Sequence, residues 1–143
     1  MDTLTPEQRH KNMQHIRSKD TKPEIVIRKF LFSKGFRYRK NDSRLPGHPD
    51  IVLPKYRTVV FVHGCFWHRH PGCPKASTPT NNHEFWQRKF DVNVVRDYKQ
   101  QSQLKEMGWH VIVVWECEIS NKKKRMERLE ALAKEISERI LDN

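Results

Sequence analysis

The sequence predicts one α/β domain in which a mixed β-sheet is flanked by helices. Short apolar runs at 50–53, 57–63 and 109–116 are typical of buried strands. A long helical segment, 83–107, separates the last two of these strands, and such a connection makes the two strands parallel neighbours in the sheet. The length of 143 residues suits a single core.

The segments before the first strands follow recognisable start and stop signals. Residues 1–20 are basic and polar, and they predict a short helix or arm. Thr21 and Glu24 have the spacing of a capping box that begins a helix, and Gly35 is placed to end it. The stretch 36–40 alternates as a half-buried strand does, and a loop rich in turn-forming residues follows.

The C-terminal part of the chain predicts an amphipathic helix. Its apolar residues recur three or four positions apart and so share one face. These residues are Met126, Leu129, Leu132, Ala133, Ile136 and Ile140. We therefore expect three parts: an arm at 1–20 that contacts a partner, a core at 21–120 and a C-terminal helix at 121–143.

The charge balance predicts a polyanionic partner. The chain has 28 Lys and Arg residues against 17 Asp and Glu, a formal net charge of +11. Nucleic acid is the first expectation, an acidic membrane surface the second, and a basic surface without a partner the alternative. No stretch approaches the roughly 20 apolar residues of a membrane span. The N-terminus also lacks an apolar signal-peptide core, so the expectation is a cytoplasmic protein.

The three cysteines predict a structural zinc site. The spacing is Cys65-x4-His70-x2-Cys73, and Cys117 lies far along the chain. Cys65 and Cys117 each follow one of the two parallel strands, so they meet at the same edge of the sheet. Three thiolates and one imidazole make a closed tetrahedral zinc site.

Two alternatives to this zinc set remain open. His63 and His68 are rival ligands, because spacing alone does not separate them from His70. The cysteines are otherwise small core residues, as free cysteines often are.

An acidic residue at the start of a strand suggests metal-assisted chemistry. Asp50 ends the stretch "PGHPD" and begins the 50–53 strand. A carboxylate there can hold a divalent cation against a phosphodiester. Most Pro-Asp pairs belong to turns, so this motif by itself is weak.

Several stretches in one order resemble the very short patch repair (Vsr) endonucleases. They are the segments 44–50, "VFVHGCFWHRH" at 60–70, "FW" at 85–86 and "GWHVIVVWEC" at 108–117. "KNM" at 11–13 and "RSKDTKPE" at 17–24 resemble the N-terminal segment of the family as well. The resemblance covers residues 9–117, which is nearly the whole predicted domain.

The resemblance implies a magnesium-dependent DNA mismatch endonuclease with a restriction-endonuclease-like fold and a structural zinc. Such an enzyme nicks the strand 5′ to the thymine of a T·G mismatch left by deamination of 5-methylcytosine. The implied partner is double-stranded DNA with that mismatch, together with other mismatch-repair proteins, and the implied state is a monomer at the bacterial nucleoid. The acid-x-Lys motif of the superfamily is replaced here by Phe61-x-His63, as in Vsr proteins.

The resemblance also implies catalytic roles. Asp50 is the main magnesium ligand, helped by the backbone carbonyl of Val62. His68 is the general base, and Asp97 orients or polarises it. A solvated salt-bridge partner on a helix is the alternative for Asp97.

Two further residues are implied to support the metal and the phosphate. They are His63 and Glu24, and simple helix capping is the alternative for Glu24. The implied zinc set is Cys65, His70, Cys73 and Cys117, which agrees with the spacing argument.

A group of flat and polar side chains is implied to contact DNA at the mismatch. Phe66, Trp67 and Trp86 correspond to intercalating residues, and Met13 enters from the minor groove. Lys89 and Asn93 lie one helical turn apart, past Trp86, and resemble residues that donate to the mismatched bases. For Phe66 and Trp67, the alternative is a core role in holding the zinc loop.

Two other functions fit the sequence less closely. One is a restriction-type or nicking endonuclease of different sequence specificity on the same scaffold. The other is a zinc-stapled module that binds distorted DNA without cutting it. The role of Asp50 separates the two enzymes from the binding module.

Overall fold

The computed structural model of the chain describes residues 20–139. Residues 1–19 and 140–143 are outside the described part. The predicted helix or arm, with Met13, and the last apolar residue of the C-terminal helix, Ile140, therefore lie outside the described residues.

Four strands form one mixed sheet in the order β1-β2-β3-β4. The first two pairs are antiparallel and β3 pairs with β4 in parallel, so the predicted mixed sheet and parallel neighbours are confirmed. The strands are β1 (Arg39–Lys40), β2 (Ile51–Leu53), β3 (Thr58–His63) and β4 (His110–Trp115).

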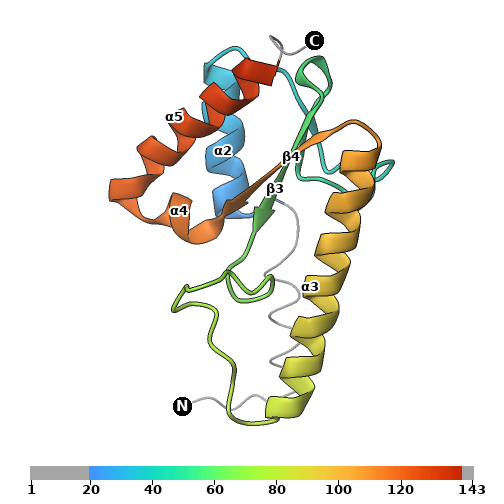
Figure 1. Cartoon of the computed structure of the whole chain (residues 1–143). Coiled ribbons are helices and arrows are strands. Elements are labelled where there is room, and N and C mark those ends of the chain that lie inside the picture. The colour runs from blue at the N-terminus through green and yellow to red at the C-terminus, as the bar shows by residue number, and fades with distance from the viewer. Residues whose placement is uncertain (1–19, 140–143) are drawn as a thin grey trace.

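Helices cover both faces of this sheet (Figure 1). The helices are α2 (Lys22–Ser33), α3 (His83–Glu106), α4 (Glu116–Ser120) and α5 (Lys122–Glu138), with a short 3-10 helix at Pro54–Tyr56. The yellow helix α3 lies on one side of β3 and β4, and α2 and α5 lie on the other. Gly35 and Gly108 follow the ends of α2 and α3 with φ of +91° each, as C-cap glycines do.

The first predicted strand is much shorter than the pattern at 36–40 suggested. Only Arg39 and Lys40 pair with β2. The N–H of Phe36 bonds to the carbonyl of Leu31 instead, at 3.0 Å, and closes the end of α2. Phe36 is also buried in the core, so its position belongs to the helix cap rather than to the sheet.

The predicted capping box at the start of α2 does not form. Thr21 is the N-cap residue, but its side chain makes no capping hydrogen bond. Glu24 accepts instead from the N–H of Asp20, at 3.0 Å, one residue before the N-cap. Glu24 is 4% exposed, so it is buried in the fold and is not part of the helix surface.

The main core lies between the sheet and the helices α2 and α5. Ile27 and Leu31 of α2 meet Leu132 and Ile136 of α5 in one buried cluster. Each such side chain contributes about 1.5–3 kcal/mol on burial. The predicted C-terminal helix therefore packs into the same core as the rest of the domain, although Met126 in its first turns is 56% exposed.

A second, smaller core lies on the other face of the sheet. Leu104 of α3 packs there against Val59 and Phe61. Alternate residues of β3 thus serve opposite cores, which explains its continuous apolar run. The strand β4 is at the edge of the sheet and is only half-buried, unlike the fully buried strand that the sequence suggested.

This arrangement places two chain segments together. The parallel strands β3 and β4 end at the same edge of the sheet. The chain leaves β3 into the 64–82 loop, which leads to α3, and it leaves β4 directly into α4, a short helix that the sequence pattern did not indicate. The candidate site lies at this edge.

Candidate active site and metal centre

A cleft of about 870 Å³ opens at this edge of the sheet. Its walls come from the start of α2, the residue before β2, the end of β3 and the middle of α3. All the residues that the sequence assigned to catalysis line it: Glu24, Asp50, Val62, His63, His68 and Asp97. The fold thus collects residues that are far apart in the sequence.

Asp50 is held against the backbone of β3. Its Oδ2 accepts a hydrogen bond from the N–H of Val62 at 2.7 Å. Burial raises the pKa of Asp50 to about 7, and the carboxylate of Glu24 adds to the rise, while the bond from Val62 opposes it. Ionised Asp50 is therefore poorly compensated by the protein, and a divalent cation at this oxygen would supply the missing charge.

Glu24 lies beside Asp50 and pairs with the cationic side chain of Arg28. Its Oε2 is 3.5 Å from Nη1 of Arg28, and Nη2 of Arg28 bonds to Oδ1 of Asp20 at 2.7 Å. Burial raises the pKa of Glu24, and the Asp20 and Thr21 hydrogen bonds and Arg28 oppose that rise. Two carboxylates, Asp50 and Glu24, therefore face one site, which is a donor set that suits a hard divalent cation.

His68 and Asp97 form a closely bonded pair. Nδ1 of His68 lies 2.5 Å from Oδ2 of Asp97, and the two side chains are only 14% and 13% exposed. Burial acts to raise the pKa of Asp97, but the bond and charge of His68 outweigh it, so the pKa is lowered. Asp97 is therefore not a solvated surface residue. With Nδ1 engaged, Nε2 is the ring atom of His68 that can accept a proton.

His63 stacks on His68 within the same cleft. The ring centroids are 3.8 Å apart and the planes differ by 8°. Atoms of His63, His68 and Asp97 lie within 4.8 Å of one another, close enough to hold a metal ion. The ring lone pairs, however, lie in two parallel planes, and one ion cannot lie in both. The stack therefore fits a role in positioning His68 better than a role in metal binding.

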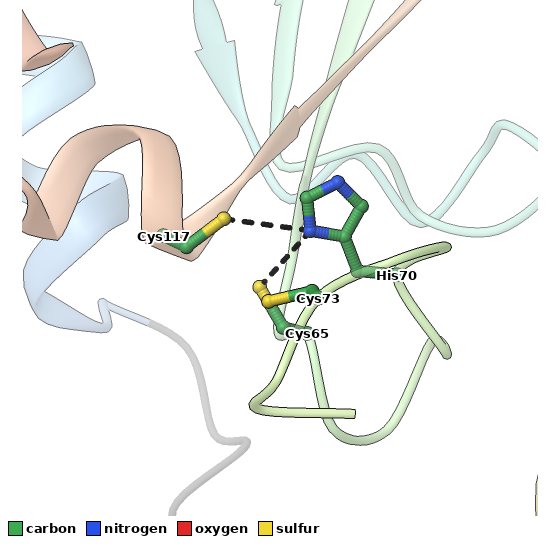
Figure 2. A group of neighbouring side chains, drawn as sticks. All are labelled: Cys65, His70, Cys73 and Cys117. Carbon is green, nitrogen blue, oxygen red and sulfur yellow. Dashed lines mark hydrogen bonds between the residues drawn. The ribbon is translucent and has the colours of Figure 1, made fainter. Parts of the chain in front are cut away.

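A second group of side chains meets at the ends of β3 and β4 (Figure 2). Its possible ligand atoms all lie within 4.8 Å of one another, and they belong to Cys65, His70, Cys73 and Cys117. Nδ1 of His70 is 3.5 Å from Sγ of Cys65 and 3.4 Å from Sγ of Cys117. This cluster could hold a metal ion, and its three sulfurs and one ring nitrogen are the donors of a closed tetrahedral site.

The structure brings His70, and not His68, to the cysteines. The His70 ring stacks on Trp115 with a centroid distance of 4.3 Å, which fixes its orientation. Burial raises the pKa of the Cys65 thiol to about 12, and the side chain of Cys117 adds to the rise. Close thiols of this kind ionise together only when a cation compensates them, so the donor chemistry fits a metal.

The predicted intercalating residues are packed against one another. Trp67 and Trp86 are 6% and 4% exposed, and together with Phe66 and Phe90 they form a separate apolar cluster. The centroids of the two tryptophan rings lie 5.9 Å apart. These side chains thus pack as core residues between the 64–82 loop and α3. Their entry into a base stack requires this cluster to open.

The polar residues predicted to meet the bases lie on the same face of α3 as Trp86. Asn93 is 1% exposed and its Nδ2 donates to the carbonyl of Trp67 at 3.2 Å. Its Oδ1 has no hydrogen-bond partner in the part of the chain that the structure describes. Lys89 is half-buried on the same face. Asn93 therefore binds the aromatic loop here and is not presented to solvent.

Among the site residues that were not singled out from the sequence, three make contacts that shape the site. Phe90 lies one helical turn after Trp86, and that spacing was a usable signal. Arg28 lies one turn after Glu24 by the same rule. Glu116 lines the cleft and accepts from the N–H of Cys65 at 3.2 Å, and nothing in the local sequence indicated that contact.

A mixed sheet with an aspartate carboxylate held at its edge, a histidine–aspartate pair in the same cleft and a strongly basic chain is the arrangement expected of a nuclease. The sequence model of the family described as DNA mismatch endonuclease Vsr matches residues 1–74. The chain belongs to this Vsr family of DNA mismatch endonucleases. It is accordingly an endonuclease, and its fold is restriction-endonuclease-like.

Curated relatives match along nearly the whole chain. The type II nicking enzyme V.NmeAIP of Neisseria meningitidis serogroup A is 52% identical over 97% of this chain and 99% of its own length. The type II nicking enzyme V.XorIIP of Xanthomonas oryzae is 47% identical, over 84% and 88%. The DNA mismatch endonuclease Vsr of Escherichia coli is 42% identical, over 92% and 83%. Among residues 20–139, no helix is long and apolar enough to cross a membrane.

Proposed function

We propose that this endonuclease is a magnesium-dependent mismatch enzyme that nicks DNA 5′ to the thymine of a T·G pair produced by deamination of 5-methylcytosine. The observation that carries the proposal is the cleft, where Asp50 lies with the His68–Asp97 pair in a chain of the Vsr family. The family relation supports the mismatch substrate, and the net charge of +11 supports DNA as the partner.

The carboxylates of Asp50 and Glu24, with the backbone carbonyl of Val62, would hold the magnesium ion. When bound, such an ion supplies positive charge at the phosphodiester and favours attack by water. The contact between Asp50 and the N–H of Val62 supports this assignment, since it fixes the carboxylate against the main chain at that residue.

His68 acts as the general base in this proposal. Asp97 holds its Nδ1 side, so the ring presents Nε2 for proton acceptance from a water molecule. His63 supports the ring from one side through the stack and keeps it at a fixed angle. The function of both residues is therefore to position and move one proton.

Zinc is the ion we propose for the cluster of Cys65, His70, Cys73 and Cys117. Its role is structural, because all four donors are protein side chains and none of the coordination is left for a substrate. The site ties the start of the 64–82 loop to the start of α4. That loop carries His68, so the zinc site also fixes the proposed base.

Recognition of the mismatch is assigned to the aromatic cluster and to residues of α3. Phe66, Trp67 and Trp86 would enter the base stack after the cluster opens, and the unstacking required, about a few kcal/mol per step, is least at a mismatch. Lys89 and Asn93 would donate to the bases. Met13 is proposed for the minor-groove side from the family resemblance.

The cellular setting follows from the same proposal. The enzyme acts as a monomer, because a T·G mismatch is an asymmetric substrate. Its location is the cytoplasm, at the nucleoid. Other mismatch-repair proteins are the proposed partners. Residues 1–20 form the DNA-contacting arm, 21–120 the endonuclease core and 121–143 the C-terminal helix in this proposal.

A second candidate is a nicking enzyme with a different recognition sequence. Relatives that are 52% and 47% identical carry the name type II nicking enzyme, which favours this candidate over a module that binds distorted DNA without cutting it. The same fold and the same cleft would serve both nicking functions. They differ in whether cleavage depends on the mismatch.

Cleavage of end-labelled duplexes tests the proposal. Matched duplexes with T·G, T·A and C·G at one position, in randomised flanks, are incubated with the protein and magnesium. We expect nicking of the T·G duplex alone, on the thymine strand and 5′ to that base. Equal cutting of the three duplexes would favour the second candidate, and no cutting of any duplex would leave a binding module.

A further inference from the structure

Arg69 stands between the two histidines that serve different sites. His68 precedes it and bonds to Asp97, and His70 follows it and joins the cysteines. Arg69 itself has a φ of +56°, a left-handed conformation that is uncommon for a residue other than glycine. Its backbone therefore reverses the chain between the two sites, and backbone hydrogen bonds from His68 to Gly64 and from His70 to Cys65 hold the residues on either side.

The guanidinium group of Arg69 contacts the second half of the loop. Nη1 donates to the carbonyls of Phe66 and Ser77, at 3.2 and 3.1 Å. Nη2 donates to the carbonyl of Ala76 at 2.6 Å and to Oγ1 of Thr78 at 2.9 Å. One side chain thus connects the start of the loop to residues 76–78.

The same group also lies on the aromatic cluster. Its central carbon is 3.9 Å from the centroid of the Phe90 ring and 5.9 Å from that of Phe66. Cation–π contacts of this kind are stronger for the planar guanidinium than for an ammonium, because its flat face stacks on the ring. Arg69 therefore contacts both the aromatic cluster and the 76–78 segment.

We propose that Arg69 is a positioning residue for mismatch recognition, which holds Phe66 and its aromatic neighbours in a fixed position relative to the 76–78 segment. The proposal rests on the function proposed above. Among the described residues the guanidinium of Arg69 contacts the loop and the aromatic rings and not the cleft carboxylates or the side chains of His68 and Asp97, so its effect falls on substrate binding and not on the chemical step.

Arg69→Lys is the most direct test, because it keeps the positive charge and removes the planar fork of donors. We expect KM for the T·G duplex to rise about tenfold, which corresponds to about 1.4 kcal/mol and is within the range of lost hydrogen bonds and ring contacts. We expect kcat to stay within about twofold, since the catalytic groups are untouched. Zinc content and the dependence of binding on salt are expected to match those of the wild type.

Two further variants make the test specific. Thr78→Val removes one acceptor of Arg69 and keeps the side-chain shape, so a smaller rise in KM in the same direction is expected. Arg37→Lys is the matched control: Arg37 also lies over a phenylalanine, Phe32, at 4.5 Å and donates to the carbonyl of Phe36, but it is outside the cleft and the loop. We expect this control to behave as the wild type does.

The outcomes separate this inference from the function on which it rests. If the wild type prefers the T·G duplex and Arg69→Lys has an unchanged KM, the role of Arg69 is wrong and the function stands. A loss of kcat with unchanged KM, or an equal loss in Arg37→Lys, also overturns the inference. If the wild type cuts T·G and T·A duplexes equally, both proposals fail.

Discussion

Replacement of Asp50 by asparagine is expected to stabilise the fold at alkaline pH while it abolishes nicking. Burial and the neighbouring Glu24 carboxylate raise the pKa of Asp50 to about 7 from 3.8. The folded chain therefore binds a proton at Asp50 more tightly than the unfolded chain does. The resulting stability is present at low pH and is lost as the pH rises toward and through 7.

The size of the effect follows from the shift in pKa. A difference of about three units corresponds to about 4 kcal/mol of destabilisation by the ionised carboxylate at pH 8. Asparagine removes this charge. The N–H of Val62 then donates to a neutral amide oxygen instead of a carboxylate, which costs about 1 kcal/mol. The net expectation is a gain of about 3 kcal/mol at pH 8, which shrinks as the pH falls toward 5.

Urea unfolding of the two proteins between pH 5 and 8 measures this difference. The buffers contain no magnesium and also no chelator, so that the cysteine cluster is not disturbed. Magnesium should then stabilise the wild type and leave Asp50→Asn unchanged, because a ligand stabilises only the state that binds it. The variant should retain affinity for T·G duplexes and lose nicking.

Asp97→Asn is the control with the opposite sign. The pKa of Asp97 is lowered because, although burial acts to raise it, the bond and charge of His68 prevail. Its carboxylate therefore contributes stability above the unfolded pKa that is lost as the pH falls, and asparagine is expected to destabilise the fold at pH 8. If Asp50→Asn is no more stable than the wild type at pH 8, ionised Asp50 does not destabilise the magnesium-free fold, and the reasoning is refuted.

Three other predictions follow from the site. His68→Gln should lower kcat by about 10²–10⁴ and leave DNA affinity unchanged in binding assays, and a smaller loss would argue against a general base. The magnesium concentration for half-maximal nicking should fall as the pH rises from 6 to 8, because ionised Asp50 is the form that binds the cation, and a flat titration would contradict that role. Cys73→Ser, or exhaustive chelation, should lower the melting temperature sharply, whereas unchanged melting together with no zinc by elemental analysis would exclude the structural zinc.

Local patterns in the sequence were enough to predict most of the fold. The apolar runs, the long helical segment between two of them and the helix-ending glycines each depend on neighbours close in sequence. The parallel pairing of β3 with β4 followed from their connection, and it correctly placed Cys65 near Cys117. The predicted strand at 36–40 is shorter because Phe36 closes the end of α2 and packs into the core, and the capping box is absent because Glu24 accepts from the N–H of Asp20.

Local patterns did not predict which of the neighbouring histidines meets Asp97 and which meets the cysteines. His68 and His70 are two residues apart and have the same chemistry, and only the left-handed turn at Arg69 directs one to Asp97 and the other to the cysteines. Backbone hydrogen bonds hold the residues on either side of that turn, from the N–H of His68 to the carbonyl of Gly64 and from the N–H of His70 to the carbonyl of Cys65. Spacing alone carries no information about it.

The sequence by itself thus predicted most of the order of elements, through local periodicity, and the family, through several motifs that occur in one order. Tertiary structure alone decided how the site residues are used. Packing of α3 against the 64–82 loop buries Trp67, Trp86 and Asn93, and burial beside Glu24 raises the pKa of Asp50. Burial and charge at one residue are set by elements far away in the chain, and for that reason they appear only when the chain is folded.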